Sequence, residues 1–454
     1  MNWPLPAKKC PGLYYGTEAK DGFLLRIRVA GGILTLPQME AIELLLDCCK
    51  QEKIQVTNRG NLQLRGLTQS PPNYIYQKLQ EVGLASRQLQ IDHLRNIMIS
   101  PTAGIDAEEL VDTRVWLKQI ITYMEDNPNK IATLPAKFSI GIDGGGIVGI
   151  GSRPSVLAYH RYNEIQFTAT RVKERILFHL EFGGRKTLIP TGILIPPEYL
   201  ITCLDSLIEI YRQHINSNID SKKVGHRLPD LIQQWGVSEY WRRVTEVNSF
   251  PYETKEVKLP PTPSTTHLGL YRQKQEGLYY LGVAPSLGYI TKKQWRGLMQ
   301  LVEKTGCGEI RLTPWQSIII PNLSDDTTKQ TTASLEELGL SVRENNSRGK
   351  VVACVGKTGC KAAITESETH ARVAIGHLQG RKQDKHPITI HFSGCGKCCA
   401  QTTPATLSFI GCWLWRDGKA VEGYKIYHKE SLIASLAAEK AISLLPELLK
   451  SLDS

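Results

Sequence analysis

An internal repeat at a spacing of about 256 residues constrains this chain more than any other feature of its sequence. Residues 21–29 resemble residues 276–283 at an offset of 255, and one inserted residue then changes the offset to 256. The new offset holds for residues 54–57 against 310–313, and again for residues 81–84 against 337–340. Agreement over this length without a further shift predicts two similar halves with the same fold.

Within each half, the residue pattern predicts strands and helices in alternation. In the first half, residues 24–29 alternate with period two, as in a strand with one buried face. A helix is expected from Thr35, because Thr35 can act as N-cap and Pro37 fits the first turn. A hairpin over residues 54–64 and a helix over about 74–82 follow. The prediction is an α+β architecture in which a longer mixed segment closes each half.

Composition and charge narrow the class of protein. The net charge is +11 and the pI is near 9.0, which suggests an anionic partner, but a solvated basic surface explains this charge equally well. Apolar runs are too short for a membrane span, and the first residues do not resemble a signal peptide. We therefore expect a cytoplasmic protein without a membrane partner. A nucleic-acid-binding module is disfavoured, because basic and aromatic residues do not interleave as they do in single-strand binders.

Five of the eleven cysteines lie within residues 354–399, where they form the pattern C-x5-C, then C-x2-C-C. Both groups follow a β-like run and a glycine-rich turn, and a helical pattern is expected after each turn. Thiolates that converge from two such turns suit an iron–sulfur cluster. A zinc site fits Cys395 and Cys398 but not the wider spacing between Cys354 and Cys360. Spacing alone does not decide which of the last three cysteines bind.

The pattern C-x5-C followed by Ser393-Gly-Cys-x3-Cys399 resembles that of the sulfite and nitrite reductase superfamily. The resemblance implies a [4Fe-4S] cluster whose last ligand can bridge to a sirohaem iron. It selects four ligands and leaves Cys398 as a spare; the four are Cys354, Cys360, Cys395 and Cys399.

The resemblance also implies the domain organisation, in which two ferredoxin-like half-domains alternate with two larger mixed α/β domains. One larger domain would bind a tetrapyrrole and the other the cluster. The expected order is a half-domain over 1–90, a tetrapyrrole-binding-type domain over 91–250, a proline-rich linker over 251–266, a half-domain over 267–345 and the [4Fe-4S]-binding domain over 346–454.

Several polar residues of the first half match the anion- and macrocycle-binding positions of the superfamily. The resemblance implies catalytic roles for Arg26, Arg95 and Lys137, and cofactor-binding roles for Arg59 and Gln63. The second half has Leu281 and Trp315 where the repeat places Arg26 and Arg59, while offset 256 pairs Cys354 with Met98 and Cys360 with Gly104. One half thus carries the cluster and the other the basic site.

Residues 144–149 match G-x-G-x-x-G, but no βαβ unit surrounds them, so a turn near the ligand is expected instead of a dinucleotide site. A flavin or nicotinamide domain is not recognisable elsewhere. Electrons should therefore come from an external donor, either a ferredoxin or an NAD(P)H-linked reductase.

Within the superfamily, four features resemble precorrin-3B synthases: the start Lys9-Cys10-Pro11-Gly12-Leu13, the short N-terminal region, Ser139 and Lys397. That resemblance implies an O₂-dependent monooxygenase of aerobic cobalamin biosynthesis. Its tetrapyrrole substrate would be precorrin-3A, which it would hydroxylate and close to a lactone, with a mononuclear non-haem iron as an additional cofactor. The alternative is a sirohaem-dependent assimilatory nitrite or sulfite reductase, which the run from Arg26 to Gly32 resembles more closely.

Overall fold

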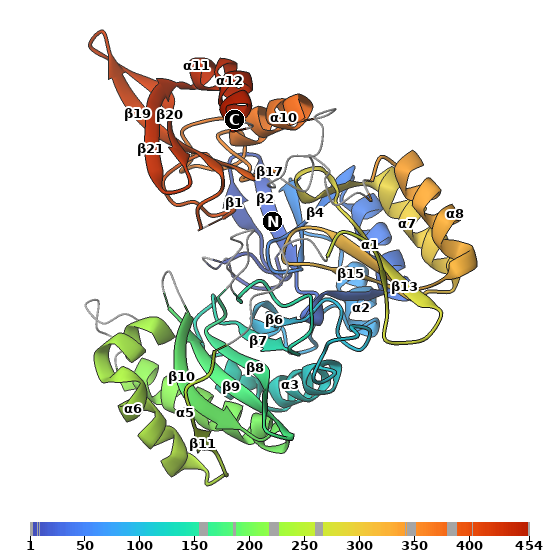
Figure 1. The fold of residues 1–454 in the computed structure, drawn as a ribbon, viewed down its shortest axis with the longest axis vertical. Coiled ribbons are helices and arrows are strands. Elements are labelled where there is room, and N and C mark those ends of the chain that lie inside the picture. The colour runs from blue at the N-terminus through green and yellow to red at the C-terminus, as the bar shows by residue number, and fades with distance from the viewer. Residues whose placement is uncertain are drawn as a thin grey trace.

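A computed structural model provides the fold. It describes residues 3–6, 8, 10–153, 162–184, 188–217, 227–258, 267–340, 342, 351–378, 388–401 and 403–452. The predicted linker therefore lies partly outside the described residues. Figure 1 shows the two repeated half-domains at the centre, with the 91–250 region on one side and the C-terminal region on the other. None of the described helices is long and apolar enough to cross a membrane.

Each half-domain is a five-stranded antiparallel sheet with two main helices. The elements of the first are β1 (Thr17–Ala19), β2 (Gly22–Ile27), β3 (Ile33–Thr35), α1 (Leu36–Cys48), β4 (Lys53–Val56), β5 (Leu62–Leu67) and α2 (Asn73–Glu81). Those of the second are β12 (Gly269–Arg272), β13 (Leu278–Val283), β14 (Tyr289–Thr291), α7 (Lys292–Thr305), β15 (Glu309–Leu312), β16 (Ile318–Ser324) and α8 (Asp325–Glu337). The duplicated α+β organisation is confirmed, and so are the strands and helices predicted for residues 24–82.

The sequence repeat includes the residues that cap the first helix of each half-domain. The backbone N–H of Thr35 donates to Gln38 Oε1 at 3.0 Å, and that of Thr291 donates to Gln294 Oε1 at 2.9 Å. Both pairs lie 256 residues apart, so the same capping box starts α1 and α7.

The half-domains exchange one strand each, which the sequence did not predict. The sheet of the first half runs β1-β2-β5-β4-β14, and that of the second runs β12-β13-β16-β15-β3. The register is reciprocal, because Thr291 pairs with Lys53 while Thr35 pairs with Glu309. Both halves consequently share one hydrophobic core, in which the Trp295 indole N–H donates to the Met39 carbonyl oxygen at 3.0 Å.

The two larger domains are also built alike. The first contains β6 (Ile97–Ile99), α3 (Arg114–Asp126), α4 (Pro128–Ile131), β7 (Ile140–Asp143), β8 (Ile165–Val172), β9 (Arg175–Gly183), β10 (Leu188–Ile195), α5 (Leu200–Ser217), α6 (Leu228–Val247) and β11 (Glu253–Thr254). The second contains β17 (Val351–Ala353), α10 (Ser367–Leu378), β18 (Ile390–Ser393), β19 (Leu407–Arg416), β20 (Lys419–His428), β21 (Ser431–Ala437), α11 (Ala438–Ser443) and α12 (Leu445–Ser451). In both sheets three parallel strands continue into antiparallel ones.

Two local expectations are wrong. A helix does not follow the second cysteine turn, because the next described element after Cys399 is strand β19. The offset of 256 also fails beyond residue 90. Strand β6 corresponds to β17 at an offset of 254, because the connection from Glu81 to Ile97 is two residues longer than that from Glu337 to Val351. The counterpart of Cys354 is therefore Ser100, not Met98.

Candidate cluster and anion site

The two cysteine-bearing loops meet directly after parallel strands β17 and β18. Cys354 follows β17, and its sulfur accepts a hydrogen bond from the Gly394 backbone N–H at 3.1 Å. The same sulfur lies 3.1 Å from the hydroxyl oxygen of Ser367, the first residue of α10. The Gly394 contact would stabilise a thiolate, because it places a polar hydrogen against the sulfur, whereas the Ser367 hydroxyl also donates to the Cys354 carbonyl oxygen at 2.9 Å.

Glycines let the two loops approach closely. A Cβ atom on Gly356, where φ is +75°, would lie 2.7 Å from the Ser367 backbone nitrogen. One on Gly394 would lie 2.7 Å from the Ala363 side chain, and one on Gly411 would clash with the Gly394 carbonyl oxygen. These positions need glycine because a backbone atom, or in the case of Gly394 the Ala363 side chain, occupies the space of a side chain.

The four predicted ligands lie near one another. Burial raises the pKa of the Cys399 thiol, and the neighbouring thiols of Cys395, Cys354 and Cys360 raise it further. In the part of the chain that the structure describes, these side chains do not form a group of three or more donors around a single ion. A cubane cluster attaches one cysteine to each of four iron corners, so its ligands surround a volume instead of a point. The donor set and the glycine-lined loops fit such a cluster.

Arg26 is a half-buried cation held by neutral groups. Its Nη2 donates to Gln63 Oε1 at 2.7 Å, while its Nε has no hydrogen-bond partner within the described ranges. Burial, together with the neighbouring guanidinium of Arg28, lowers the pKa of Arg26 to about 9. Because a buried charge is costly without a counter-ion, this guanidinium is suited to an anionic ligand.

Arg59 joins the first half-domain to the 91–250 domain. Its guanidinium donates to Asn163 Oδ1 at 2.7 Å, to the Tyr162 carbonyl oxygen at 2.9 Å and to Ser139 Oγ at 3.2 Å. The preceding residue, Asn58, donates to the carbonyl oxygens of Cys399 and Ala400, both at 3.3 Å. The basic hairpin loop of one half therefore contacts the last cysteine of the other half. Asn58 and Asn163 were missed from the sequence, since a single asparagine carries no distinguishing pattern.

The remaining two predicted residues differ in environment. Arg95 is buried and donates to Asp92 Oδ1 at 3.2 Å and to the Leu84 carbonyl oxygen at 2.7 Å. Lys137 is exposed and forms no hydrogen bond or ion pair with any residue that the structure describes. The structure thus brings together Arg26, Arg59 and Gln63 beside the cluster loops, commits Arg95 to a buried ion pair, and leaves Lys137 accessible.

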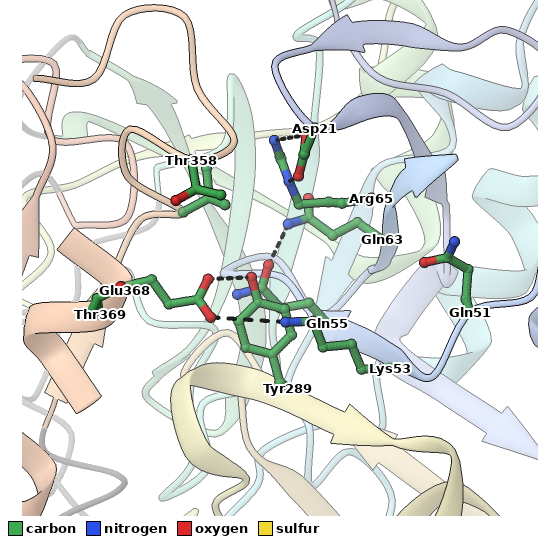
Figure 2. A pocket seen from close by; sticks show the side chains of 11 residues that line it. Asp21, Gln51, Lys53, Gln55, Gln63, Arg65, Tyr289, Thr358, Glu368 and Thr369 are labelled. Carbon is green, nitrogen blue, oxygen red and sulfur yellow. Dashed lines mark hydrogen bonds and ion pairs between the residues drawn. The ribbon is translucent and has the colours of Figure 1, made fainter. Parts of the chain in front are cut away.

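A polar cavity of about 300 Å³ lies where the first half-domain, strand β14 and the C-terminal domain meet. Gln63 and Gln55 both line this cavity, and Gln63 Nε2 donates to Gln55 Oε1 at 2.5 Å. Figure 2 shows the Glu368 carboxylate pointing toward Tyr289 and Lys53, with the Tyr289 hydroxyl donating to it at 2.9 Å. Arg65 pairs with Asp21 at 2.9 Å and donates to the carbonyl oxygen of Gly359 at 2.7 Å, which fixes the cluster loop against the first half-domain.

Comparison with known families accounts for this arrangement. The model of the nitrite/sulfite reductase ferredoxin-like half domain matches residues 15–82 and 271–338. The model of the nitrite and sulphite reductase 4Fe-4S domain matches residues 90–251. The chain belongs to the nitrite and sulfite reductase superfamily. The region that matches the 4Fe-4S domain model, residues 90–251, contains a single cysteine, Cys203. The four predicted cluster ligands therefore lie in the C-terminal domain, which is built like the matched one.

Curated relatives and a solved structure cover most of the chain. It is 29% identical over 427 residues to the ferredoxin–nitrite reductase of Synechococcus elongatus, covering 92% of this chain and 81% of that protein. It is 25% identical over 427 residues to sulfite reductase [ferredoxin] 1 of Mycolicibacterium paratuberculosis, covering 90% and 73%. The structure of the Mycobacterium tuberculosis NirA protein shares the fold, with a TM-score of 0.79 and 21% identity over 94% of this chain and 80% of that one.

These relatives support the predicted [4Fe-4S] cluster, and sirohaem, which the prediction tied to the reductase alternative. They overturn the expectation of a precorrin-3B synthase, and with it the monooxygenase activity and the cobalamin pathway. The features that favoured the synthase were a short run at the start of the sequence, the short N-terminal region and two single positions, Ser139 and Lys397. Lys397, for instance, is exposed, so the fold constrains its identity only weakly, whereas the similarity to reductases extends over nine-tenths of the chain.

Proposed function

We propose that this protein is a ferredoxin-dependent assimilatory nitrite reductase that uses a [4Fe-4S] cluster and sirohaem. The names of its relatives in Synechococcus elongatus and Leptolyngbya laminosa, the latter 28% identical over 432 residues, support this activity and this electron donor. The reaction takes nitrite to ammonium with six electrons and eight protons, and releases two waters. Such a reaction needs an electron relay next to an anion site.

The observation that carries the proposal is the contact between the basic loop and the last cysteine. Asn58 holds the backbone of Cys399 at 3.3 Å, and its neighbour Arg59 reaches the 91–250 domain. A macrocycle beside Cys399 would therefore lie next to side chains of the first half. Within this proposal Cys354, Cys360, Cys395 and Cys399 hold the cluster, and Cys398 is the spare.

The chain's own residues bind and orient the anions. Arg59 and Gln63 would hold sirohaem carboxylates, because a guanidinium binds a carboxylate through two hydrogen bonds. Arg26 would attract nitrite, since its half-buried charge has no acidic partner among the described residues, and exposed Lys137 would add a second positive charge. When bound, the cluster and sirohaem supply the one-electron steps and an iron that binds the substrate nitrogen.

A neutral residue at position 139 favours nitrite over sulfite. Ser139 is buried, and its hydroxyl oxygen already accepts a hydrogen bond from Arg59. A lysine at this position would add a positive charge, whereas serine adds none. Nitrite carries one negative charge and sulfite up to two, so the less basic site suits nitrite. Sulfite is the second candidate, because sulfite reductases also match the chain.

The test is anaerobic turnover of nitrite and of sulfite by the purified holoenzyme, with reduced ferredoxin as donor. Ammonium from nitrite should form at a kcat/KM at least tenfold above that for sulfide from sulfite. A preference for sulfite would make the second candidate correct. Failure to reduce either anion, with the cluster and sirohaem both present, would contradict the proposal.

A further inference from the structure

A chain of side-chain amides connects Arg26 to the second half-domain. Arg26 Nη2 donates to Gln63 Oε1 at 2.7 Å. Figure 2 shows the next link, in which Gln63 Nε2 donates to Gln55 Oε1 at 2.5 Å. Gln55 Nε2 in turn donates to the carbonyl oxygen of Leu287 at 3.0 Å. Leu287 lies two residues before β14, the strand that the second half-domain adds to this sheet.

The two ends of the chain fix the direction of every hydrogen bond in it. A guanidinium can only donate, so Gln63 turns its oxygen toward Arg26 and its nitrogen toward Gln55. A backbone carbonyl can only accept, so Gln55 turns its nitrogen toward Leu287. Each amide therefore has one orientation that satisfies both of its neighbours. Hydrogen bonds aligned in this way strengthen one another.

The C-terminal domain holds the residue at the far end of the chain. The Leu287 side chain is 3% exposed and packs in the hydrophobic core that includes Val351, Ile390 and Phe409. Its φ is +53°, whereas the repeat counterpart is Gly31, where φ is +73°. A leucine in this left-handed conformation is strained, and such strain persists only where the surrounding structure fixes it. The carbonyl oxygen that anchors the chain is consequently held in one place.

The matching positions of the second half-domain do not form a chain of this kind among the residues described. By strand register, the counterpart of Arg26 is Gly282 instead of the Leu281 expected from the sequence. Gln63 and Gln55 are matched by Ile319 and Arg311. Glycine and isoleucine have no hydrogen-bonding side chain, and the arginine donates to two carbonyl oxygens of the 91–250 domain at 2.7 and 3.0 Å. The amide chain therefore accompanies the Arg26 guanidinium and is not a requirement of the half-domain fold.

The contact with Gln63 leaves part of the Arg26 guanidinium available to a ligand. Its Nη2 is held, while its Nε has no hydrogen-bond partner among the residues that the structure describes. A guanidinium is rigid and planar, so a hydrogen bond at one nitrogen restricts the direction in which the others point. A group held in its binding orientation loses less freedom when a ligand arrives.

We propose that Gln55 is a positioning residue that acts through Gln63 to hold the Arg26 guanidinium in the orientation that binds the anionic substrate. The inference rests on the proposed function, which assigns nitrite binding to Arg26. It adds that the second half-domain and the C-terminal domain, through Leu287, set the geometry of a site that lies in the first half.

The test is a double-mutant cycle on the Kd of the holoenzyme for nitrite, measured by spectroscopic titration. Gln55→Met keeps the length of the side chain but removes the amide, and should weaken the Kd about threefold to tenfold. In an Arg26→Ala background the same substitution should change the Kd by less than about twofold, because the group that Gln55 positions is gone. Gln55→Asn is a second variant, too short to reach both partners, and should behave like Gln55→Met.

The matched control is Gln51→Met. Gln51 lines the same cavity but lies outside the chain, since its Nε2 donates to the carbonyl oxygen of Cys49 at 3.3 Å. This variant should bind nitrite within about twofold of the wild type. All variants should keep the wild-type cluster absorbance and circular dichroism.

A crystal structure of the Gln55→Met variant separates this inference from the proposed function. The Arg26 guanidinium should leave its wild-type orientation or adopt more than one. An unchanged orientation would overturn the positioning role, and so would an equal loss of nitrite affinity from Gln55→Met with and without Arg26. A wild type that binds neither nitrite nor sulfite would defeat the proposed function, and the orientation of Arg26 in the variant would still decide the positioning role.

Discussion

The loops that follow the parallel strands of the two larger domains have the same backbone arrangement but carry different side chains, cysteines in one domain and a serine with glycines in the other. In the C-terminal domain, the Gly394 N–H donates to Cys354 Sγ at 3.1 Å. In the first large domain, the Gly144 N–H donates to Ser100 Oγ at the same 3.1 Å. Strands β7 and β18 correspond at an offset of 250, so residues 144–149, Gly-Gly-Gly-Ile-Val-Gly, are the counterpart of residues 394–399, Gly-Cys-Gly-Lys-Cys-Cys.

The difference shows how a duplicated fold can build one asymmetric centre. Thiolates are soft ligands that bind iron–sulfur clusters, whereas a serine hydroxyl and glycines are not. The first half lacks the ligands but carries Arg26 and Arg59, and the hairpin loop with Arg59 reaches the cysteine loop through Asn58. Each half thus supplies what the other lacks, and the strand exchange between β3 and β14 fixes them together.

The largest expected effect comes from replacing the two matched hydrogen-bond acceptors, Cys354 and Ser100, with alanine. Cys354→Ala should abolish the cluster, because it removes one of four iron ligands, whereas Ser100→Ala should leave it intact. Iron and acid-labile sulfide content and the EPR spectrum of the reduced protein measure the outcome. Cys398→Ser serves as a second control and should retain the cluster. Full iron and sulfide in Cys354→Ala would show that the matched loops do not differ in this way.

The next largest effect distinguishes the buried Arg95 from the exposed Lys137. Arg95→Ala should lower the free energy of unfolding by about 3–5 kcal/mol, because it leaves the buried Asp92 carboxylate without its partner. Lys137→Ala should change it by less than about 0.5 kcal/mol, since Lys137 is exposed. Chemical denaturation followed by circular dichroism measures both. Equal stability of the two variants would remove the structural role from Arg95.

Arg26→Ala should weaken nitrite binding tenfold to a hundredfold, about 1.5–3 kcal/mol, because a charge-assisted hydrogen bond is lost. Arg26→Lys should recover part of the affinity, while Lys329→Ala, a charge removed from α8, should not change it. A spectroscopic titration of the holoenzyme with nitrite measures the Kd. Wild-type affinity in Arg26→Ala would place the anion elsewhere.

The smallest effect tests the core that the half-domains share. Trp295→Phe should reduce the free energy of unfolding by about 1 kcal/mol, because the hydrogen bond from the indole to Met39 is lost while the aromatic packing stays. Its repeat counterpart gives the control: Met39→Leu keeps the backbone acceptor and should change stability less. A larger loss in Met39→Leu than in Trp295→Phe would contradict this account.

Local and repeated features could be predicted from the sequence, and pairings between distant segments could not. Thr35 and Pro37 mark the start of α1 because capping is local, and the cysteine spacing marks the cluster loops because glycines surround it. The strand exchange could not be predicted, since β3 and β14 are three residues each and fit either sheet. The counterpart of Cys354 was misplaced because the connection from Glu81 to Ile97 is two residues longer than that from Glu337 to Val351.

The contact between Asn58 and Cys399 illustrates the same limit, since it joins residues 341 positions apart. Distance along the chain also hides the role of Arg65, which binds the carbonyl oxygen of Gly359. The synthase expectation failed for a different reason: it relied on a short run near the start of the sequence, the short N-terminal region and two single positions, whereas the similarity to reductases extends over about nine-tenths of the chain.

The central claim is that one half holds the cluster while the other helps to hold a tetrapyrrole beside it. Its most direct test is the content of iron, acid-labile sulfide and extractable sirohaem in protein purified without oxygen. The account predicts one sirohaem for each [4Fe-4S] cluster in the wild type, and loss of sirohaem with retention of the cluster in Arg59→Ala. A wild-type protein with a full cluster but no sirohaem would contradict it.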